Sequence, residues 1–151
     1  MKKIVILLGL LLGLSLALAA PNGEQVYQTY CMSCHQANGK GLPGAFPPLV
    51  GVVPQIIAKD RALPIDIVLF GIQGALNIDS ATYNGVMPPY GNQLKDDQVA
   101  AVLNYIAKAW GNDKLLPKGF KDYQPAEVAK ERAKKLNAQK VYELWKKAMG
   151  Q

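Results

Sequence analysis

The sequence predicts a mainly all-α fold of short helices, with one small β-hairpin and a helical C-terminal extension. Apolar residues recur every three or four positions over residues 23–34, 96–110 and 138–149, which is the spacing of an amphipathic helix. Glycine and proline punctuate residues 36–51, which indicates an irregular loop between helices. The length of 151 residues is typical of one domain.

The remaining elements follow from local signals. Pro64 suits the first turn of a helix, and the apolar residues after it continue that helix. The residues around Asp79 and Ser80 alternate loosely, as in a small hairpin. Asp96 and Asp97 favour the N-terminus of the long helix that follows them. Further helices are therefore expected at residues 52–59, 64–71 and 125–136, and a hairpin at residues 74–85.

The first twenty residues have the layout of a signal peptide. Two lysines precede an apolar run over residues 4–20, which ends in small residues. Ala19 completes an A-x-A pattern, so cleavage is expected before Ala20. Removal of residues 1–19 would leave a soluble protein in the periplasm. The alternative is an uncut membrane anchor, because the apolar run approaches the length of a membrane span.

The motif Cys31-Met32-Ser33-Cys34-His35 has the C-x-x-C-H pattern that attaches a c-type haem. Residues three apart on a helical turn share a face, so both sulfurs can meet one porphyrin edge, with His35 next to the iron. An exported chain could instead use the two cysteines for a disulfide. A thioredoxin-like site needs a βαβ context, and a zinc site needs four Cys or His ligands. We therefore expect one haem c, bound through thioethers to Cys31 and Cys34.

Met87 is the expected second axial ligand of the haem iron. His35 is the only histidine, which excludes bis-His ligation within a monomer. Among the four methionines, Met1 leaves with the signal, Met32 is held between the cysteines, and Met149 lies near a fraying end. A methionine that only fills a gap in the core is the alternative interpretation of Met87. The pairing of His with Met is known for haem iron and raises its potential.

An iron closed on both sides predicts one-electron transfer rather than substrate chemistry. The sequence offers no evident acid–base pair for the distal side, so we predict an electron-transfer protein and not an enzyme. Two alternatives stay open. One is a gas-binding or peroxidatic haem protein with a labile Met87, and the other is a membrane-tethered carrier that keeps residues 4–20.

The net charge of +6 is distributed unevenly along the chain. Residues 20–111 hold five basic and six acidic residues, whereas residues 112–151 hold ten basic and five acidic residues. We take the first segment as the haem domain and the second as a basic helical extension. Lysine-rich helical faces are usually solvated, so no nucleic-acid binding is expected. Val141, Leu144 and Trp145 lie at helical spacing, which predicts that the extension packs on the domain.

The order of these features resembles the class I, mono-haem cytochromes c over about residues 20–111. The shared features are a first helix, C-x-x-C-H, a Pro-rich loop, short helices, a Met-Pro segment and a last helix with aromatic residues. The resemblance implies a crossing of the first helix, at Gly23 and Tyr27, with the helix that carries Tyr105. It also implies that the carbonyl of Pro47 accepts a hydrogen bond from the ligand His35.

Residues 39–49, 83–87 and 100–104 resemble more closely the soluble members of this family from extremely thermophilic bacteria. Those proteins have a long C-terminal extension and carry electrons to a terminal haem–copper oxidase. The resemblance therefore implies a carrier in a respiratory chain, with a quinol:cytochrome c reductase upstream and a terminal oxidase downstream. It also implies a monomer with a mostly uncharged docking face.

Overall fold

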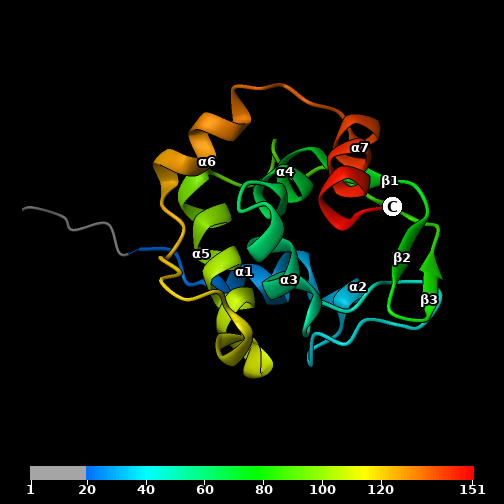
Figure 1. Ribbon diagram of the computed structural model, residues 1–151. Coiled ribbons are helices and arrows are strands. Elements are labelled where there is room, and N and C mark those ends of the chain that lie inside the picture. Colours follow the sequence, from blue (N-terminus) through cyan, green and yellow to red (C-terminus); the bar gives the residue numbers. More distant parts are fainter. Residues whose placement is uncertain (1–19) are drawn as a thin grey trace, which may run out of the picture.

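The computed structural model describes residues 20–151, so the predicted signal peptide, residues 1–19, lies outside the described residues. The described chain forms seven α-helices, one 3₁₀ segment and two small antiparallel sheets (Figure 1). This arrangement confirms the predicted, mainly α-helical fold with a small hairpin. No helix within residues 20–151 combines the length and the apolar character needed to cross a membrane.

The elements follow one another in short segments. The helices are α1 (Gly23–Tyr30), α2 (Met32–His35), α3 (Val52–Lys59), α4 (Leu63–Phe70), α5 (Asp96–Lys108), α6 (Pro125–Arg132) and α7 (Ala138–Met149), with the 3₁₀ segment η1 (Ala109–Leu115). The strands are β1 (Ile72–Gln73), β2 (Leu76–Ile78), β3 (Ala81–Tyr83) and β4 (Val86–Met87).

The first predicted helix is divided at Cys31. This residue has φ −116°, outside regular helix geometry, and separates α1 from α2. Its backbone N–H still donates to the carbonyl of Tyr27, at 2.9 Å. Its own carbonyl accepts from the N–H groups of Cys34 and His35, at 3.2 and 2.9 Å. The C-x-x-C-H motif therefore forms one hydrogen-bonded helical turn of its own.

Helix α1 crosses α5 at close range, as the family resemblance implies. A Cβ at Gly23 would collide with the carbonyl oxygen of Ala101, so only glycine fits this crossing without a shift. The ring of Tyr27 lies 5.5 Å from that of Tyr105 and 5.1 Å from that of Trp110, measured between centroids. These contacts fix the direction of α1 and hence the place of α2 at its end.

The long helix ends earlier than its apolar spacing predicts. It stops at Lys108, and Trp110 then takes a left-handed φ of 55°. The indole Nε1 of Trp110 donates to the carbonyl of Ala37 at 3.1 Å. This change of backbone direction turns Trp110 back toward α1, where its ring contacts Tyr27. Helical spacing in the sequence does not predict the change of direction.

The predicted hairpin is present as β2 and β3, which pair Leu76 with Tyr83 around a turn at Asp79. A second pair of strands was not predicted: β1 and β4 set Ile72 opposite Met87. Two-residue strands are too short to produce an alternating pattern in the sequence. This second pairing is what holds Met87 beside the end of α4.

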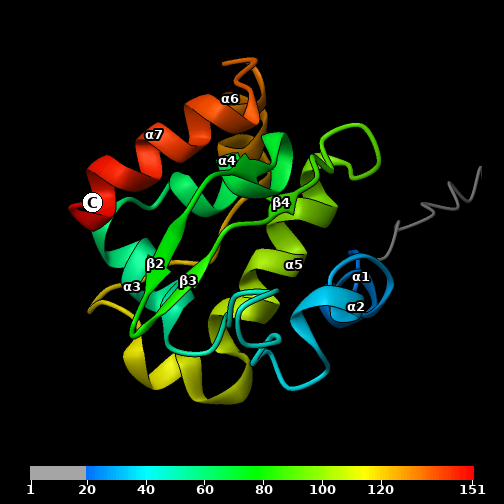
Figure 2. The ribbon, with the colours of Figure 1, turned by 90° about the vertical axis from the view of Figure 1, so that its right-hand side faces the viewer.

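The C-terminal extension packs along the rest of the fold. Helix α6 lies against α5 and α4, and α7 lies against α4, β1 and α3 (Figures 1 and 2). Val141 and Trp145 of α7 join a buried apolar cluster that includes Ile72 and Leu76. The hydroxyl of Tyr142 also donates to the carbonyl of Ala75, at 3.1 Å. The apolar stripe of α7 thus covers the hairpin side of the domain.

A buried carboxyl group lies where α6 meets α4. Asp66 is 1% exposed, near Glu131 and 3.9 Å from the ammonium of Lys134. Lys134 also pairs with Glu131. Burial raises the pKa of Asp66 to about 7; Lys134 opposes this rise, and the Glu131 carboxyl adds to it. Between pH 3.8 and about 7 we therefore expect the folded protein to keep a proton on Asp66 that the unfolded chain has released.

Asp66→Asn is expected to remove a loss of stability that the wild type undergoes as the pH rises from about 4 to 7. A raised pKa in the folded state means that folding is favoured at low pH and loses this contribution as the pH rises through that range. With rising pH, the free energy of unfolding of the wild type should fall more steeply than that of the variant, by up to ~1.4 kcal/mol per pH unit. Denaturant unfolding at several pH values measures it. Asp79→Asn, at an exposed turn, should keep the wild-type slope, and an Asp66→Asn slope equal to wild type would contradict the assignment.

Candidate haem site

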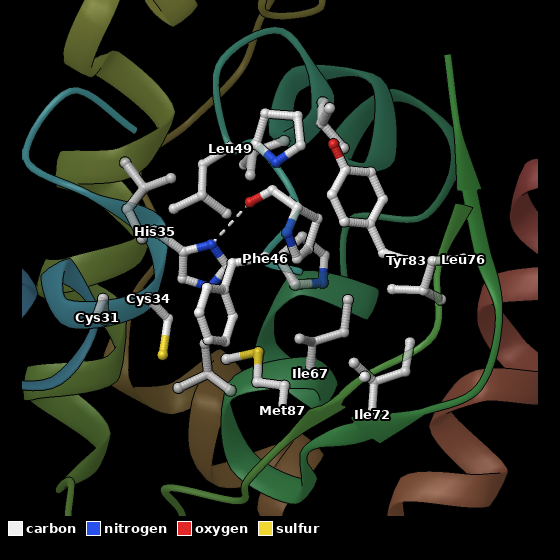
Figure 3. Close-up of a pocket in the computed structure, with 18 of the residues that line it drawn as sticks. Cys31, Cys34, His35, Phe46, Leu49, Ile67, Ile72, Leu76, Tyr83 and Met87 are labelled. Carbon is white, nitrogen blue, oxygen red and sulfur yellow. Dashed lines mark hydrogen bonds between the residues drawn. The ribbon is translucent and has the colours of Figure 1, made fainter. Parts of the chain in front are cut away.

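A cavity with mainly apolar walls lies between α2, α3, α4, the hairpin and α7 (Figure 3). Its lining brings together all five residues that the sequence singled out, namely Cys31, Cys34, His35, Pro47 and Met87. The other walls include Leu49, Val52, Val53, Ile56, Ile67, Val68, Ile72, Leu76 and Ile78. No Asp, Glu, Lys or Arg of residues 20–151 lines this cavity. The site therefore lacks the charged groups that acid–base catalysis uses.

Cys31 and Cys34 lie at one side of the cavity, on the helical turn of α2 and its N-cap (Figure 3). Burial raises the pKa of Cys31 to about 11, and the nearby Cys34 adds to this effect. A disulfide oxidoreductase needs the opposite, a thiol whose pKa is lowered so that the thiolate can attack. The raised pKa of the half-buried Cys31 thus argues against a reactive redox pair.

His35 is held in a defined orientation. Its Nδ1 lies 3.0 Å from the carbonyl oxygen of Pro47, and because a carbonyl can only accept, Nδ1 carries the proton (Figure 3). Burial lowers the pKa of His35, although the bond to Pro47 opposes this effect. The imidazole is therefore neutral, with the lone pair on Nε2, which is the form that binds a metal.

The loop that carries Pro47 folds tightly around the histidine. Gly41 donates its N–H to the carbonyl of His35 at 3.0 Å, with φ 62°. A Cβ at Gly41 would collide with the carbonyl oxygen of Phe46 and meet that of Pro47. A glycine is thus needed at this position to let the loop return to the ring of His35.

Met87 enters the cavity from β4, on a different element from the thiols and the histidine (Figure 3). Pairing with Ile72 fixes its backbone on one side. On the other, a Cβ at Gly71 would collide with the carbonyl oxygen of Met87. Close packing at Gly71 and strand pairing together place the thioether at the cavity.

Five aromatic residues that the sequence did not assign to the site also line the cavity, namely Tyr30, Phe46, Tyr83, Tyr90 and Trp145. Tyr83 comes from β3 and Trp145 from α7. Trp145 is 2% exposed, and its Nε1 has no hydrogen-bond partner among the described residues. In Figure 3, Tyr83 and Leu76 lie across the cavity from Cys31. The helical stripe of α7 could predict that Trp145 is buried, but not which element it covers.

The side chains present fit a covalently bound haem. Two thiols on one helical turn can each form a thioether, and a neutral imidazole and a thioether sulfur are both iron ligands. The apolar walls suit the porphyrin. The unpartnered indole N–H of Trp145 is a donor of the kind that a carboxylate of such a group would accept from.

Comparison with known proteins also supports a haem site. The protein family described as cytochrome c matches residues 20–110. The chain is similar to a cytochrome c-552 of Thermus thermophilus, with 52% identity over 134 residues, which are 87% of this chain and 88% of that protein. A second Thermus thermophilus cytochrome c-552 is 50% identical over 122 residues, covering 80% of this chain and 91% of that one.

A more distant similarity involves only the domain part of a larger protein. The cytochrome c subunit of the quinone alcohol dehydrogenase of Gluconobacter oxydans is 37% identical over 92 residues. These residues are 60% of this chain but only 19% of that subunit. The two Thermus relatives, in contrast, match this chain over most of their own length.

Proposed function

Because this chain belongs to the cytochrome c family, which carries covalently bound haem c, we propose that it is a soluble one-electron carrier with a single haem. It is an electron-transfer protein rather than an enzyme. The observation that carries the proposal is the convergence of Cys31, Cys34, His35 and Met87 on one apolar cavity. We propose residues 20–111 as the haem domain, with residues 112–151 as an extension packed on it.

Each of these side chains has a role in the proposal. When bound, the haem supplies a one-electron Fe(III)/Fe(II) couple. Cys31 and Cys34 would hold it through thioether bonds, and His35 would offer Nε2 to the iron while Pro47 keeps the ring oriented through Nδ1. Met87 would offer a neutral thioether sulfur to the same iron, which would favour the ferrous state and raise the potential.

The surroundings support electron transfer over ligand binding. The apolar walls exclude water and disfavour the extra positive charge of the ferric iron. His35 and Met87 are each braced by backbone contacts, so both would keep one position in the two redox states. Little rearrangement would then accompany the transfer of an electron.

An apolar rim beside the cavity offers a docking face for redox partners. Leu42, Phe46 and Val86 form this rim, with 52%, 37% and 61% of their surface exposed. Phe46 and Val86 also line the cavity, and Leu42 forms a backbone bridge with Phe46. We propose that a quinol:cytochrome c reductase and a terminal haem–copper oxidase dock here, largely through apolar contacts.

The proposed setting is the periplasm, where such a carrier would link the complexes of a respiratory chain. Its support is the signal-like composition of residues 1–19, which ends in small residues before Ala20. A mature protein that begins at Ala20 would agree with this setting, and one that begins at Met1 would favour a membrane-tethered carrier.

One set of measurements on the reduced protein tests the proposed function. Carbon monoxide is expected not to bind rapidly at neutral pH, because both iron positions are filled. Electron transfer to a haem–copper oxidase is expected to proceed at a rate that changes little with ionic strength, since residues 20–111 are nearly neutral. Rapid binding of carbon monoxide would instead indicate a gas-binding or peroxidatic protein with a labile Met87. A rate that falls steeply with salt would contradict apolar docking.

A further inference from the structure

We propose that Arg132, in the C-terminal extension, is a positioning residue for the haem ligand Met87. It clamps the chain between Met87 and α5, which we call the methionine segment (residues 88–95). The inference rests on the proposed role of Met87 as an axial ligand. It gives the extension a part in the haem site that goes beyond covering the core.

The guanidinium of Arg132 is directed entirely at one stretch of chain. Its Nε donates to the carboxylate of Asp96 at 2.7 Å, and Nη2 donates to the carbonyl of Leu94 at 2.9 Å. Nη1 donates to the carbonyl of Gly91. The side chain is 31% exposed, so these charge-assisted bonds are partly shielded from water. One residue at the end of α6 thus binds two points of the methionine segment and the first residue of α5.

Helix α4 also holds the methionine segment. The N–H of Tyr90 donates to the carbonyl of Val68 at 2.9 Å, and the N–H of Gly91 donates to that of Leu69 at 3.1 Å. A Cβ at Gly91 would come within 2.7 Å of the Leu69 oxygen and 3.3 Å of Nη1 of Arg132. At Gly91, the chain is therefore enclosed between the last turn of α4 and the guanidinium.

These contacts can affect the position of the Met87 sulfur, because Met87 is only four residues from Gly91. If the methionine segment moves away from α4, only the β1–β4 pair and the close contact with Gly71 still hold the backbone of Met87. A neutral thioether then has to compete with other ligands from a less ordered chain. The planar guanidinium serves three acceptors at once, which the single ammonium of a lysine cannot reproduce in the same geometry.

The alternative is that Arg132 only anchors α6 to the domain. Arg61 provides a matched control for this alternative. It binds Glu127 of the same helix through two nitrogens, at 2.8 and 3.1 Å, with 35% of its side chain exposed. None of its described hydrogen bonds or ion pairs involves the methionine segment. Both arginines therefore tether α6, but only Arg132 also holds residues next to Met87.

The experiment compares wild type, Arg132→Ala, Arg132→Lys and Arg61→Ala as oxidised holoproteins. The near-infrared charge-transfer band between methionine sulfur and ferric iron reports the bond, and the rate of imidazole binding reports how often it opens. Both Arg132 variants are expected to have a weaker band and imidazole binding that is faster by on the order of tenfold or more, since hydrogen bonds to a charged group are lost. Arg61→Ala should match wild type in both readouts, even with a lower melting temperature.

The measurements distinguish ligation by Met87 from the positioning role of Arg132. If wild type lacks the band, methionine ligation fails, and the role of Arg132 fails with it. If wild type shows the band and the Arg132 variants keep both the band and the wild-type imidazole rate, the clamp is refuted while the ligand assignment stands. An equal change in Arg61→Ala would overturn the specific clamp in favour of a general effect of loosening α6. Arg132→Lys keeps a positive charge at this position, so it gives a readout even if Arg132→Ala does not fold.

Discussion

Met87→Ala is expected to leave the haem covalently attached but to open the sixth position of its iron. Cys31, Cys34 and His35 lie on another element than Met87, so removing the Met87 sulfur should not affect attachment. Without the neutral sulfur the ferrous state loses a stabilising ligand, and the reduction potential should fall on the order of a hundred millivolts, within the ~0.8 V range set by axial ligands. Optical spectra, carbon monoxide binding and potentiometry measure the three effects.

Met32→Ala is the matched control for this variant. Met32 lies within the C-x-x-C-H turn, is 37% exposed and does not line the cavity. Its replacement should leave the spectrum and the potential close to wild type. A Met87→Ala protein with an unchanged spectrum would show that another group is the sixth ligand.

Trp145→Ala is expected to lower the free energy of unfolding by ~3–5 kcal/mol, the usual cost of removing a buried aromatic side chain. Trp145 is 2% exposed and packs where α7 covers the hairpin and the end of α4. Its removal would leave a void next to the cavity as well as unpacked apolar side chains. Thermal and denaturant unfolding of the holoprotein measure the loss, and the optical spectrum shows whether the haem surroundings change.

Leu115→Ala provides the comparison for Trp145→Ala, because Leu115 is also apolar but 58% exposed. Surface substitutions of this kind usually change stability by no more than ~0.5 kcal/mol. Equal stabilities for Trp145→Ala and wild type would mean that α7 does not pack on the domain in solution.

The position of Trp145 illustrates what helical spacing can and cannot predict. Val141 and Trp145 share one face of α7, so local periodicity suffices to predict that this face is buried. The partner of the face is set by the path of residues 112–137, which no local pattern encodes. The lining role of Trp145 therefore appears only when the chain is folded.

Backbone reversals and very short strands also cannot be predicted from local sequence patterns, because they depend on tertiary contacts. Trp110 leaves the helix with φ 55° because its ring packs against Tyr27 and its N–H reaches Ala37, and both contacts are distant in sequence. The pairing of Ile72 with Met87 joins two strands of two residues each. Neither feature has a periodicity of its own, so tertiary contacts decide both.

The fold class, the family and the attachment motif can all be predicted from the sequence, because each depends on the identity and spacing of neighbouring residues. Cys31, Cys34 and His35 lie within one helical turn, so their chemistry can be recognised without the rest of the molecule. Only the folded chain brings Pro47, Met87 and Trp145 to the same cavity as this turn. The hydrogen bonds of Arg132 near the methionine segment likewise form only in the folded chain. These contacts join residues far apart in the chain, and their geometry follows from the packing of whole helices rather than from any local pattern.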